Sequence, residues 1–515
     1  MTAPDRLSSF FFRNTASRLF GCFVLLHLAL WTLLPWLTSF NVPLDVIEGY
    51  AWGREWLIGT YKHPPMQSWW LEILAVLTGR AEWAHFLASQ IAVAVAFWAV
   101  WRTGRRLSGD TKALLGVLLL EGVAYYNFTS PEFNPNVLQL PFWALAGWSF
   151  HRAVKENRWF DWALLGVWMA AGIYAKYIML LFAGILFALL VFTAEGRKRW
   201  RSFGPYLALA ACFLLLAPHL HWLITHDFLP FTYAQSRTSE ATAWYQRLTF
   251  PLAFTGAVAL ALAPMIFLVF VLSGKRPTLV PKSLRPLPAF DRHFLHAVAL
   301  GPFIVLLLLS ALIGFRPRDM WGACLWNFIG LWSVTFIVNP LSLERLRFFA
   351  YAWGGVFLLG LAAIVVSNIF GIYATHAPLR VQFPGRALTE SIVSEWQKDE
   401  PGTFPSYIIG DTWLAGNVAF YAPAASAHTR PRVFIMADPV ISPWIDAKGL
   451  ERNGGILLWC SNRCADAESA KSIPPYYLER FPDAQIQQPL TLSWQTQAVL
   501  PPVVAGWAIL PPRRD

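Results

Sequence analysis

Residues 41–70 read NVPLDVIEGYAWGREWLIGTYKHPPMQSWW, and this stretch decides how the rest of the chain is interpreted. It follows an apolar run long enough to cross a bilayer, yet it holds several charged or titratable residues among aromatic ones. They are Asp45, Glu48, Arg54, Glu55, Lys62 and His63. Charge at this density costs little in water and a great deal in hydrocarbon, so we expect the stretch to lie at a membrane face.

The composition indicates a polytopic membrane protein. Of the 515 residues, 56% are hydrophobic and 14% are charged, which is too apolar for a soluble protein. Windows of roughly 20 mainly apolar residues, enough to span a bilayer as a helix, recur along the chain, and we predict about eleven transmembrane helices. They cover approximately residues 19–40, 83–101, 113–126, 137–150, two helices within 162–193, 206–224, 248–272, 294–313, one between 321 and 343, and 349–373.

The formal net charge of +11 is distributed in short basic clusters between the apolar runs. Cytoplasmic loops of membrane proteins carry such clusters, so the charge does not indicate a nucleic-acid partner. With a cytoplasmic N-terminus, most basic residues fall on the inside, in clusters at residues 102–106, 151–158, 196–201, 273–286 and 343–347. An odd number of spans then places the C-terminal part outside. The first span lacks a small-residue cleavage site and is expected to remain uncleaved.

Five segments fall on this same outer face, where one site could gather them. They are the opening stretch, the loop NFTSPEFNPN at 127–136, Lys176 in a hairpin turn, the polar loop 226–246 and GFRPRDMW at 314–321.

The composition changes near residue 374. We therefore predict a transmembrane domain over 1–373 and a small soluble α/β domain over 374–515. The β-like runs are PSYIIGD, RVFIMAD, GGILLWC and VVAGWAIL, and SYIIGDTWLAGNVAFY reads as strand, turn and helix. Neither a Walker loop nor GxGxxG is present, and this part shows no catalytic constellation. Its two cysteines, Cys460 and Cys464, favour a short-loop disulfide over free thiols if the compartment is oxidising.

Asp45 is the first candidate for chemistry. It stands just beyond a span, with Glu48 one helical turn on. Partial desolvation raises the proton affinity of a carboxylate, while a neighbouring Lys62 or Arg54 lowers it again. Such a group suits a general base for a hydroxyl acceptor or a metal ligand. A helix N-cap followed by a first-turn acid explains the same spacing.

Cationic residues form the second set of candidates. Lys62 and His63 precede two prolines and could hold a phosphate, although a snorkelling lysine before a proline helix start explains them equally. Tyr61 lies beside them and also suits an aromatic belt. Lys176 stands in an otherwise uncharged hairpin, where an ionisable residue suggests function or snorkelling to the interface. Arg316 and Arg318 could clamp a phosphate or anchor the chain at the interface.

The order of these features resembles the glycosyltransferase C superfamily, in the bacterial branch related to protein O-mannosyltransferases and to the aminoarabinose lipid A transferase. The resemblance rests on PLDVIEGYAWGREWLIGTYKHPPMQSW, then FNPNVLQLPFWAL, then GIYAKYIMLL, and it covers residues 19–193 well. It implies that Asp45, with Glu48 beside it, is the catalytic base. It also implies that Lys62, His63 and Lys176 belong to the donor-phosphate or acceptor site.

The chain departs from the family pattern at two positions. The family often has Asp where Asn136 stands, and the nearest carboxylate here is Glu132. This departure weakens the argument for a metal ion bridged by carboxylates. Whether a divalent cation is needed stays open. His63 occupies the place of a lysine directly before the two prolines, which leaves the phosphate contact open between Lys62 and His63. Arg54, Tyr61, Glu132, Asn136, Arg316 and Arg318 complete the expected substrate-binding set.

The resemblance implies transfer of one sugar from a polyprenyl-phosphate donor, with inversion, at the periplasmic face of a bacterial inner membrane. The acceptor would be lipopolysaccharide, another envelope glycan or a protein. A lipid or solute transporter is the alternative, and a scaffold protein is the third interpretation. A transporter predicts repeated halves and charges near the bilayer midplane, whereas this sequence shows no repeat and gathers its charges at one face.

Overall fold

The computed structural model describes residues 3–238, 240–274, 287–338, 341–375, 377, 379–423, 429–461, 464–494 and 500–513. The basic cluster expected at 273–286 lies almost wholly outside these residues. The chain divides into two compact units. Unit 1 comprises Met1–Thr32, Tyr61–Met66 and Leu87–Ala363, and unit 2 comprises Leu33–Thr60, Gln67–Phe86 and Ile364–Asp515.

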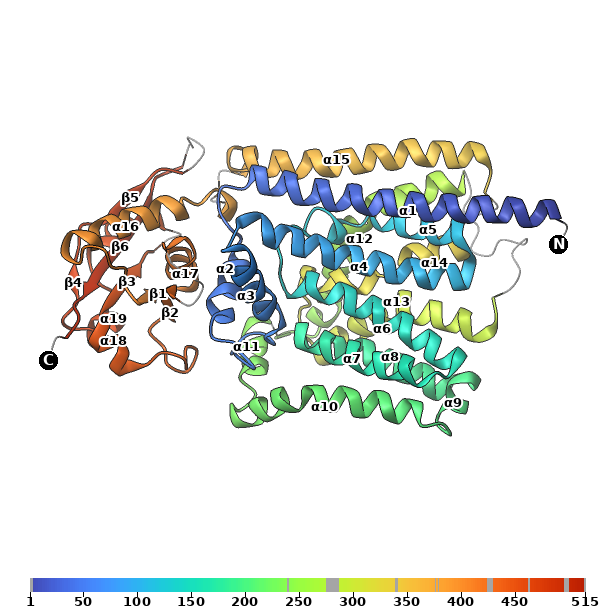
Figure 1. The fold of residues 1–515 in the computed structure, drawn as a ribbon, viewed down its shortest axis with the longest axis horizontal. Coiled ribbons are helices and arrows are strands. Elements are labelled where there is room, and N and C mark those ends of the chain that lie inside the picture. Colours follow the sequence, from blue (N-terminus) through green and yellow to red (C-terminus); the bar gives the residue numbers. More distant parts are fainter. Residues whose placement is uncertain are drawn as a thin grey trace. The chain divides into compact units, whose positions relative to one another are not determined.

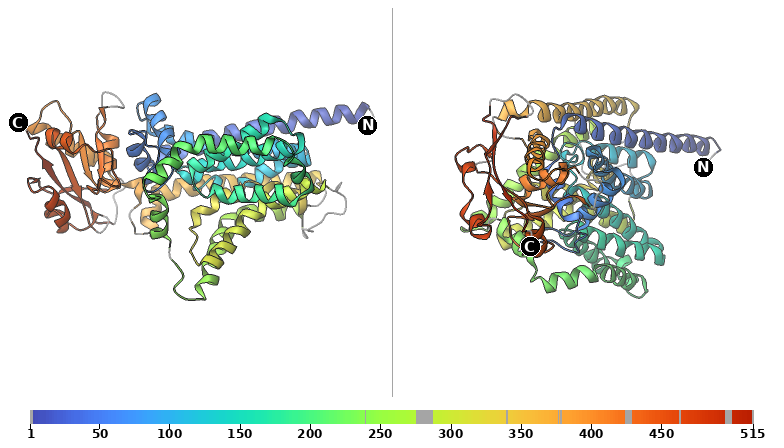
Figure 2. Two further views of the ribbon diagram at one scale, coloured as in Figure 1. Left: turned by 90° about the horizontal axis from the view of Figure 1, so that it is seen from below. Right: turned by 60° about the vertical axis from the view of Figure 1, so that its left-hand side comes forward.

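Unit 1 is built from helices, most of which run side by side (Figure 1; Figure 2). Three of them, α1, α4 and α15, belong to it for most of their length and continue into unit 2. The elements are α1 (Ala3–Thr38), α4 (Glu82–Ser108), α5 (Asp110–Leu120), η1 (Ala124–Tyr126), α6 (Pro135–Glu156), α7 (Trp159–Ala175), α8 (Met179–Phe192), α9 (Ala194–Arg199), α10 (Gly204–Thr225), α11 (Leu229–Arg237), α12 (Gln246–Ser273), α13 (Ala289–Ile313), η2 (Asp319–Trp326), α14 (Ile329–Phe336) and α15 (Leu343–Thr375).

Every predicted span coincides with helical structure, and six helices are long and apolar enough to cross a membrane among the residues described. These are α4, α10, α12, α13, α15 and the part of α1 from Thr15 to Thr38. The third and tenth spans differ from expectation. Helix α5 already ends at Leu120, and the tenth segment is divided between η2 and α14. Asn327 stands at this division, where its amide donates to the Leu140 carbonyl oxygen at 3.0 Å.

Glycines allow two short helices of unit 1 to approach closely. A Cβ added to Gly330 of α14 would lie 2.1 Å from the carbonyl oxygen of Gly116 in α5. Helix α7 packs against both α6 and α10. A polar network lies inside this bundle, where the Nδ1 atom of His27 is 2.8 Å from Oε2 of Glu121 and Trp31 donates to Oε1 at 2.9 Å.

Unit 2 contains a mixed six-stranded sheet in the order β2-β1-β3-β6-β4, with β5 also paired to β6. Strands β1 (Tyr407–Gly410), β2 (Arg432–Ile435) and β3 (Gly455–Trp459) are parallel, and the pairs made by β6 (Val503–Leu510) are antiparallel. The expected strand, turn and helix is present, because the Asp411 carboxylate after β1 caps α17 (Thr412–Tyr421). The small α/β domain expected from the sequence is thus confirmed.

Helices cover both faces of this sheet. Helix α17 and α16 (Gly385–Asp399) pack on one face. On the other, Ile409 and Leu457 share a core with Leu450 of α18 (Ala447–Asn453) and Tyr477 of α19 (Pro475–Arg480). Two short strands and one turn complete the unit. They are β4 (Gln485–Ile486), β5 (Leu490–Leu492) and η6 (Ser469–Lys471).

Most of the opening stretch belongs to unit 2, whereas Tyr61–Met66 belongs to unit 1. The stretch and the residues that follow it form α2 (Leu44–Gly53) and α3 (Met66–Thr78). Helix α2 packs on α17 so closely that a Cβ added to Gly416 would lie 2.4 Å from Cγ2 of Ile47. The backbone N–H groups of Phe40 and Asn41 donate to the carbonyl oxygen of Val381, in η3 (Arg380–Gln382), at 2.8 and 3.0 Å.

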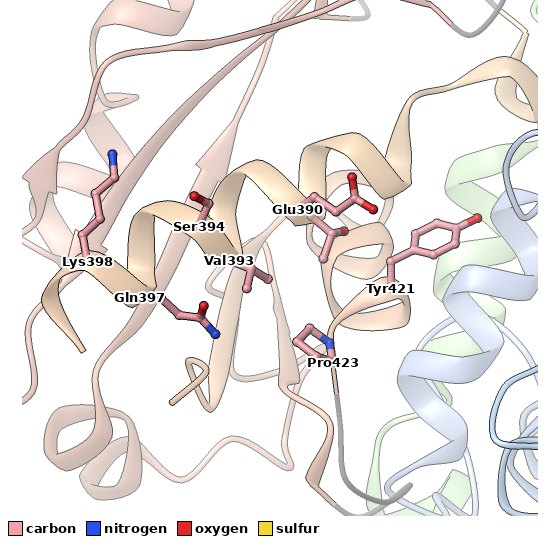
Figure 3. A pocket seen from close by; sticks show the side chains of 8 residues that line it. Glu390, Val393, Ser394, Gln397, Lys398, Tyr421 and Pro423 are labelled. Carbon is pink, nitrogen blue, oxygen red and sulfur yellow. The ribbon is translucent and has the colours of Figure 1, made fainter. Parts of the chain in front are cut away.

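Two further features lie in unit 2. A disulfide joins Cys460 and Cys464. A cavity of about 500 Å³ lies along α16, where Glu390 and Gln397 line it together with Tyr421 from the end of α17 (Figure 3).

Candidate functional site

In unit 1 the candidate site is organised around Lys176. This residue ends α7, and its extended backbone separates α7 from α8. The Lys176 ammonium donates a hydrogen bond to Oδ1 of Asn136 at 2.5 Å. Asn136 is buried in the first turn of α6, where Pro135 occupies an early helical position and Asn134 accepts the Asn136 N–H at 2.9 Å. A capped helix start therefore fixes the amide that orients the lysine.

The positive charges of Lys62 and Lys176 act on the side chain of His63. Its side chain keeps part of its surface accessible, yet desolvation, together with the positive charges of Lys176 and Lys62, lowers the pKa of His63 well below its usual value. The imidazole is therefore neutral near pH 7 and can donate or accept one hydrogen bond. The three residues combine two positive charges with a neutral polar ring, which suits a phosphate group.

Two aromatic residues that neighbour these cations in the sequence make ring contacts within unit 1. The Tyr177 hydroxyl lies 2.9 Å from Nε2 of His219, and its ring stacks on Phe231 of α11. The ring of Tyr61 meets that of Tyr233 edge to face, with centroids 5.5 Å apart. Helix α11 therefore contacts both the residue before Lys62 and the residue after Lys176.

The remaining candidates of unit 1 take different positions. Arg318 donates to the carbonyl oxygen of Arg237, the last residue of α11, at 3.4 Å. The side chain of Arg316 is exposed, and that of Glu132 is partly exposed in the loop before α6. The structure thus brings Tyr61 and Arg318 to the same helix, while Arg316 faces solvent or lipid.

Asp45, Glu48 and Arg54 belong to unit 2. Asp45 stands in the first turn of α2, partly exposed, and its carbonyl oxygen accepts from Nε2 of Gln67 at 2.7 Å. Glu48, one turn later, is buried. Arg54 follows the helix, where it donates to the carbonyl oxygen of Arg430 and lies 3.7 Å from Glu55.

Sequence reasoning missed the polar groups that hold α2 and α3 to the sheet. Glu72 of α3 forms an ion pair with Arg430, and the two side chains are only 1% and 4% exposed. Arg80 donates to the carbonyl oxygens of Ala419, Phe420 and Ala422, and desolvation lowers its pKa to about 10. Glu72 alone carried a signal, because a single acid within an apolar helical run requires a partner.

The predicted site residues are therefore divided between the units. Unit 1 holds Lys62, His63, Lys176 and the two arginines at 316 and 318, and unit 2 holds Arg54 together with the carboxylates of α2. Among the described residues, no group of three or more His, Cys, Asp or Glu side chains is placed to hold a metal ion. The ring of His219 stacks against those of Tyr177 and Trp222.

Comparisons with known proteins give one family match and similarity of fold. Residues 62–222 match the family described as dolichyl-phosphate-mannose-protein mannosyltransferase. The structure is similar to that of ArnT from Cupriavidus metallidurans bound to undecaprenyl phosphate, with 12% identity, a TM-score of 0.59, and coverage of 96% of this chain and 97% of that one. For the apo state of the same ArnT, the identity is 11%, the TM-score is 0.57, and the match covers 95% of this chain and 98% of that one. No curated protein sequence matches the chain.

The fold defines the class first: this is a multi-pass membrane protein with a fold of the glycosyltransferase C type. The family match covers residues 62–222 only, so this match and the fold shared with ArnT show a resemblance to protein O-mannosyltransferases and to ArnT. The resemblance noted from the sequence is thus confirmed.

Proposed function

We propose that this chain is a glycosyltransferase that moves a single sugar from a polyprenyl-phosphate donor to an acceptor hydroxyl, with inversion. The reaction takes place at the periplasmic face of a bacterial inner membrane, with the N-terminus in the cytoplasm. The acceptor is lipopolysaccharide, another envelope glycan or a protein. The family match supports the lipid-linked donor, because residues 62–222 include Lys62, His63, Asn136 and Lys176.

One observation carries the proposal: Lys176 is held by Asn136, and its charge and that of Lys62 both act on His63. A sugar phosphodiester gains negative charge on its phosphate when the bond to the sugar breaks. Two ammonium groups placed beforehand stabilise that charge without reorganisation at the moment of reaction. The neutral ring of His63 adds a hydrogen bond to a phosphate oxygen without another desolvated charge.

Asp45 has the role of general base. Its carboxylate removes the proton of the acceptor hydroxyl, and the resulting oxygen attacks the anomeric carbon while the bond to the lipid phosphate breaks. Attack from the face opposite the leaving group inverts the anomeric configuration. Glu48, buried one turn further along α2, acts beside Asp45, and Arg54, Tyr61, Glu132, Arg316 and Arg318 contribute to substrate binding.

Transfer assays in membranes test this mechanism. Membranes containing the chain are supplied with radiolabelled polyprenyl-phosphate sugars and total envelope acceptors, at verified equal protein levels. We expect Asp45→Asn to lower transfer about a hundredfold or more. Its matched control is Asp483→Asn, at an exposed carboxylate of unit 2 whose ion partner is Arg513. Equal transfer by the parent and Asp45→Asn would remove Asp45 from the mechanism.

The donor site is tested separately at Lys176. Lys176→Met should lower transfer about a hundredfold, because it removes a charge that stabilises the leaving phosphate. Lys176→Arg keeps the charge and should retain more activity. Lys112→Gln, which removes a partly exposed lysine near the start of α5, should leave transfer unchanged. An active Lys176→Met protein would refute the proposed phosphate site, and transport of the lipid without sugar transfer would favour the flippase alternative.

A further inference from the structure

A second charged cavity lies far from the Lys176 site, where α4 and α6 end. It has a volume of about 600 Å³ and is lined by five arginines and two carboxylates, which gives its lining a formal net charge of +3. The arginines are Arg102, Arg105, Arg106, Arg152 and Arg158, and the carboxylates are those of Asp110 and Glu156. This end of unit 1 lies towards the right in Figure 1, where α9 is labelled.

The length of α6 separates this cavity from the Lys176 site. Asn136 stands at the start of α6 and Arg152 in its last turns, and both belong to unit 1. At about 1.5 Å of rise per residue, the two positions are about 24 Å apart along the helix axis. The cavity therefore opens near the opposite membrane face and takes no part in binding at Lys176.

Ion pairs neutralise only part of this cluster. Arg105 pairs with Asp110, Arg106 with Glu156, and Arg152 lies 3.0 Å from Asp161. Arg158 shares Glu156 with Arg106, at 3.1 Å. Arg102 makes no ion pair with any residue that the structure describes. Arg102 lies three and four positions before Arg105 and Arg106 on the same helix. Like charges at these spacings repel each other, and a bound anion would relieve the repulsion.

Tryptophans hold the guanidinium groups at the depth of the membrane interface. Arg102 lies 5.4 Å from the ring centroid of Trp98 and 5.7 Å from that of Trp148. On the other side, Arg152 lies 4.7 Å from Trp148. Stacking on indole rings orients the planar guanidinium groups, and tryptophan is enriched where phospholipid headgroups lie.

We propose that this cavity binds the phosphate headgroup of an anionic phospholipid from the membrane leaflet opposite the Lys176 site. Guanidinium forks match phosphate oxygens in a bidentate way, and basic pockets between helix ends suit anionic headgroups. A lipid is the favoured source, because the cavity lies between helix ends at the interface and is bordered by tryptophan. The inference does not depend on the proposed transfer reaction.

Binding of lipid to the full-length protein tests the proposal. The protein is purified, placed in phosphatidylcholine nanodiscs containing increasing phosphatidylglycerol or cardiolipin, and the retained lipid is counted by native mass spectrometry. The parent should retain one or more anionic lipids. Arg102→Gln combined with Arg152→Gln should weaken retention about thirtyfold.

Two further measurements keep the result decisive. Arg201→Gln combined with Arg345→Gln removes the same number of charges from the loops after α9 and at the start of α15, and should retain lipid as the parent does. Arg102→Gln alone leaves the ion pairs of the other arginines intact and serves if the double variant fails to fold. Retention equal to that of the parent in the variants that lack Arg102 would overturn the proposal, as would displacement of the lipid by inorganic pyrophosphate at matched charge concentration.

Discussion

Removal of one partner from the Glu72–Arg430 ion pair should open unit 2 without touching its apolar core. Both side chains are almost wholly buried, at 1% and 4% exposure, so Arg430→Met leaves the Glu72 carboxylate desolvated and unpaired. Breaking a buried pair in this way costs about 3–5 kcal/mol. The Arg54 side chain still finds the carbonyl oxygen of residue 430, because that contact is made by the backbone.

Hydrogen exchange followed by mass spectrometry measures this cost in the full chain. Amides of α2, α17 and β1 that exchange only when unit 2 opens should exchange faster by about two to four orders of magnitude in Arg430→Met. The double variant Glu72→Leu with Arg430→Met removes both charges, so it should recover most of the lost protection.

The matched control is Arg513→Met, which breaks an ion pair whose side chains are 66% and 70% exposed. An exposed pair contributes at most about 1 kcal/mol, so exchange in the same amides should change little. If Arg430→Met behaved like Arg513→Met, or if the double variant were no more protected than Arg430→Met, the buried pair would not hold α3 to the sheet.

Two further predictions concern a titration and a covalent bond. The pKa of His63 is lowered in the folded chain, so the unfolded chain binds more protons and stability is lost as the pH falls below the usual histidine pKa. The thermal unfolding midpoint should therefore drop more between pH 7.5 and 5.5 in the parent than in His63→Gln. Equal drops in the two proteins would contradict the assigned environment of His63. The Cys460–Cys464 disulfide closes a short loop, so Cys460→Ser with Cys464→Ser should lower stability by about 2 kcal/mol, measured by denaturant unfolding of the β1–β3 region, and thiol alkylation of the unreduced parent should leave both cysteines unlabelled.

The membrane spans and the main strands could be predicted because each depends on a local pattern. Apolar runs of sufficient length mark helices such as α12 and α13, and the β-branched run at residues 503–510 marks β6. The division of the tenth span into η2 and α14 and the strands β4 and β5 could not be predicted with the same rules. Their backbones are placed by partners far along the chain, such as the paired Leu490 and Ala505.

The candidate site was predictable for a different reason. Lys176 could be selected because an ionisable residue in an uncharged hairpin requires an explanation, and the structure supplies Asn136 as its partner. The pair of His27 and Glu121 follows the same rule, yet the sequence does not reveal it, since each residue stands alone within its apolar run and their separation of 94 positions hides the contact. Sequence patterns identify ionisable residues that need partners, but only the fold identifies the partners.

The sheet domain of unit 2 has a structural connection to the proposed chemistry if Asp45 is the base. Asp45 lies on α2, and α2 is held by the sheet domain through close backbone packing of Gly416 on Ile47 as well as through Arg430. Any side chain at Gly416 must push α2 away, since its Cβ would come within 2.4 Å of the Ile47 methyl group. A substitution there would change no proposed catalytic residue, yet it would move the Asp45 carboxylate relative to the rest of unit 2. If Asp45 is the base, the sheet domain would act on catalysis by fixing the helix that carries it.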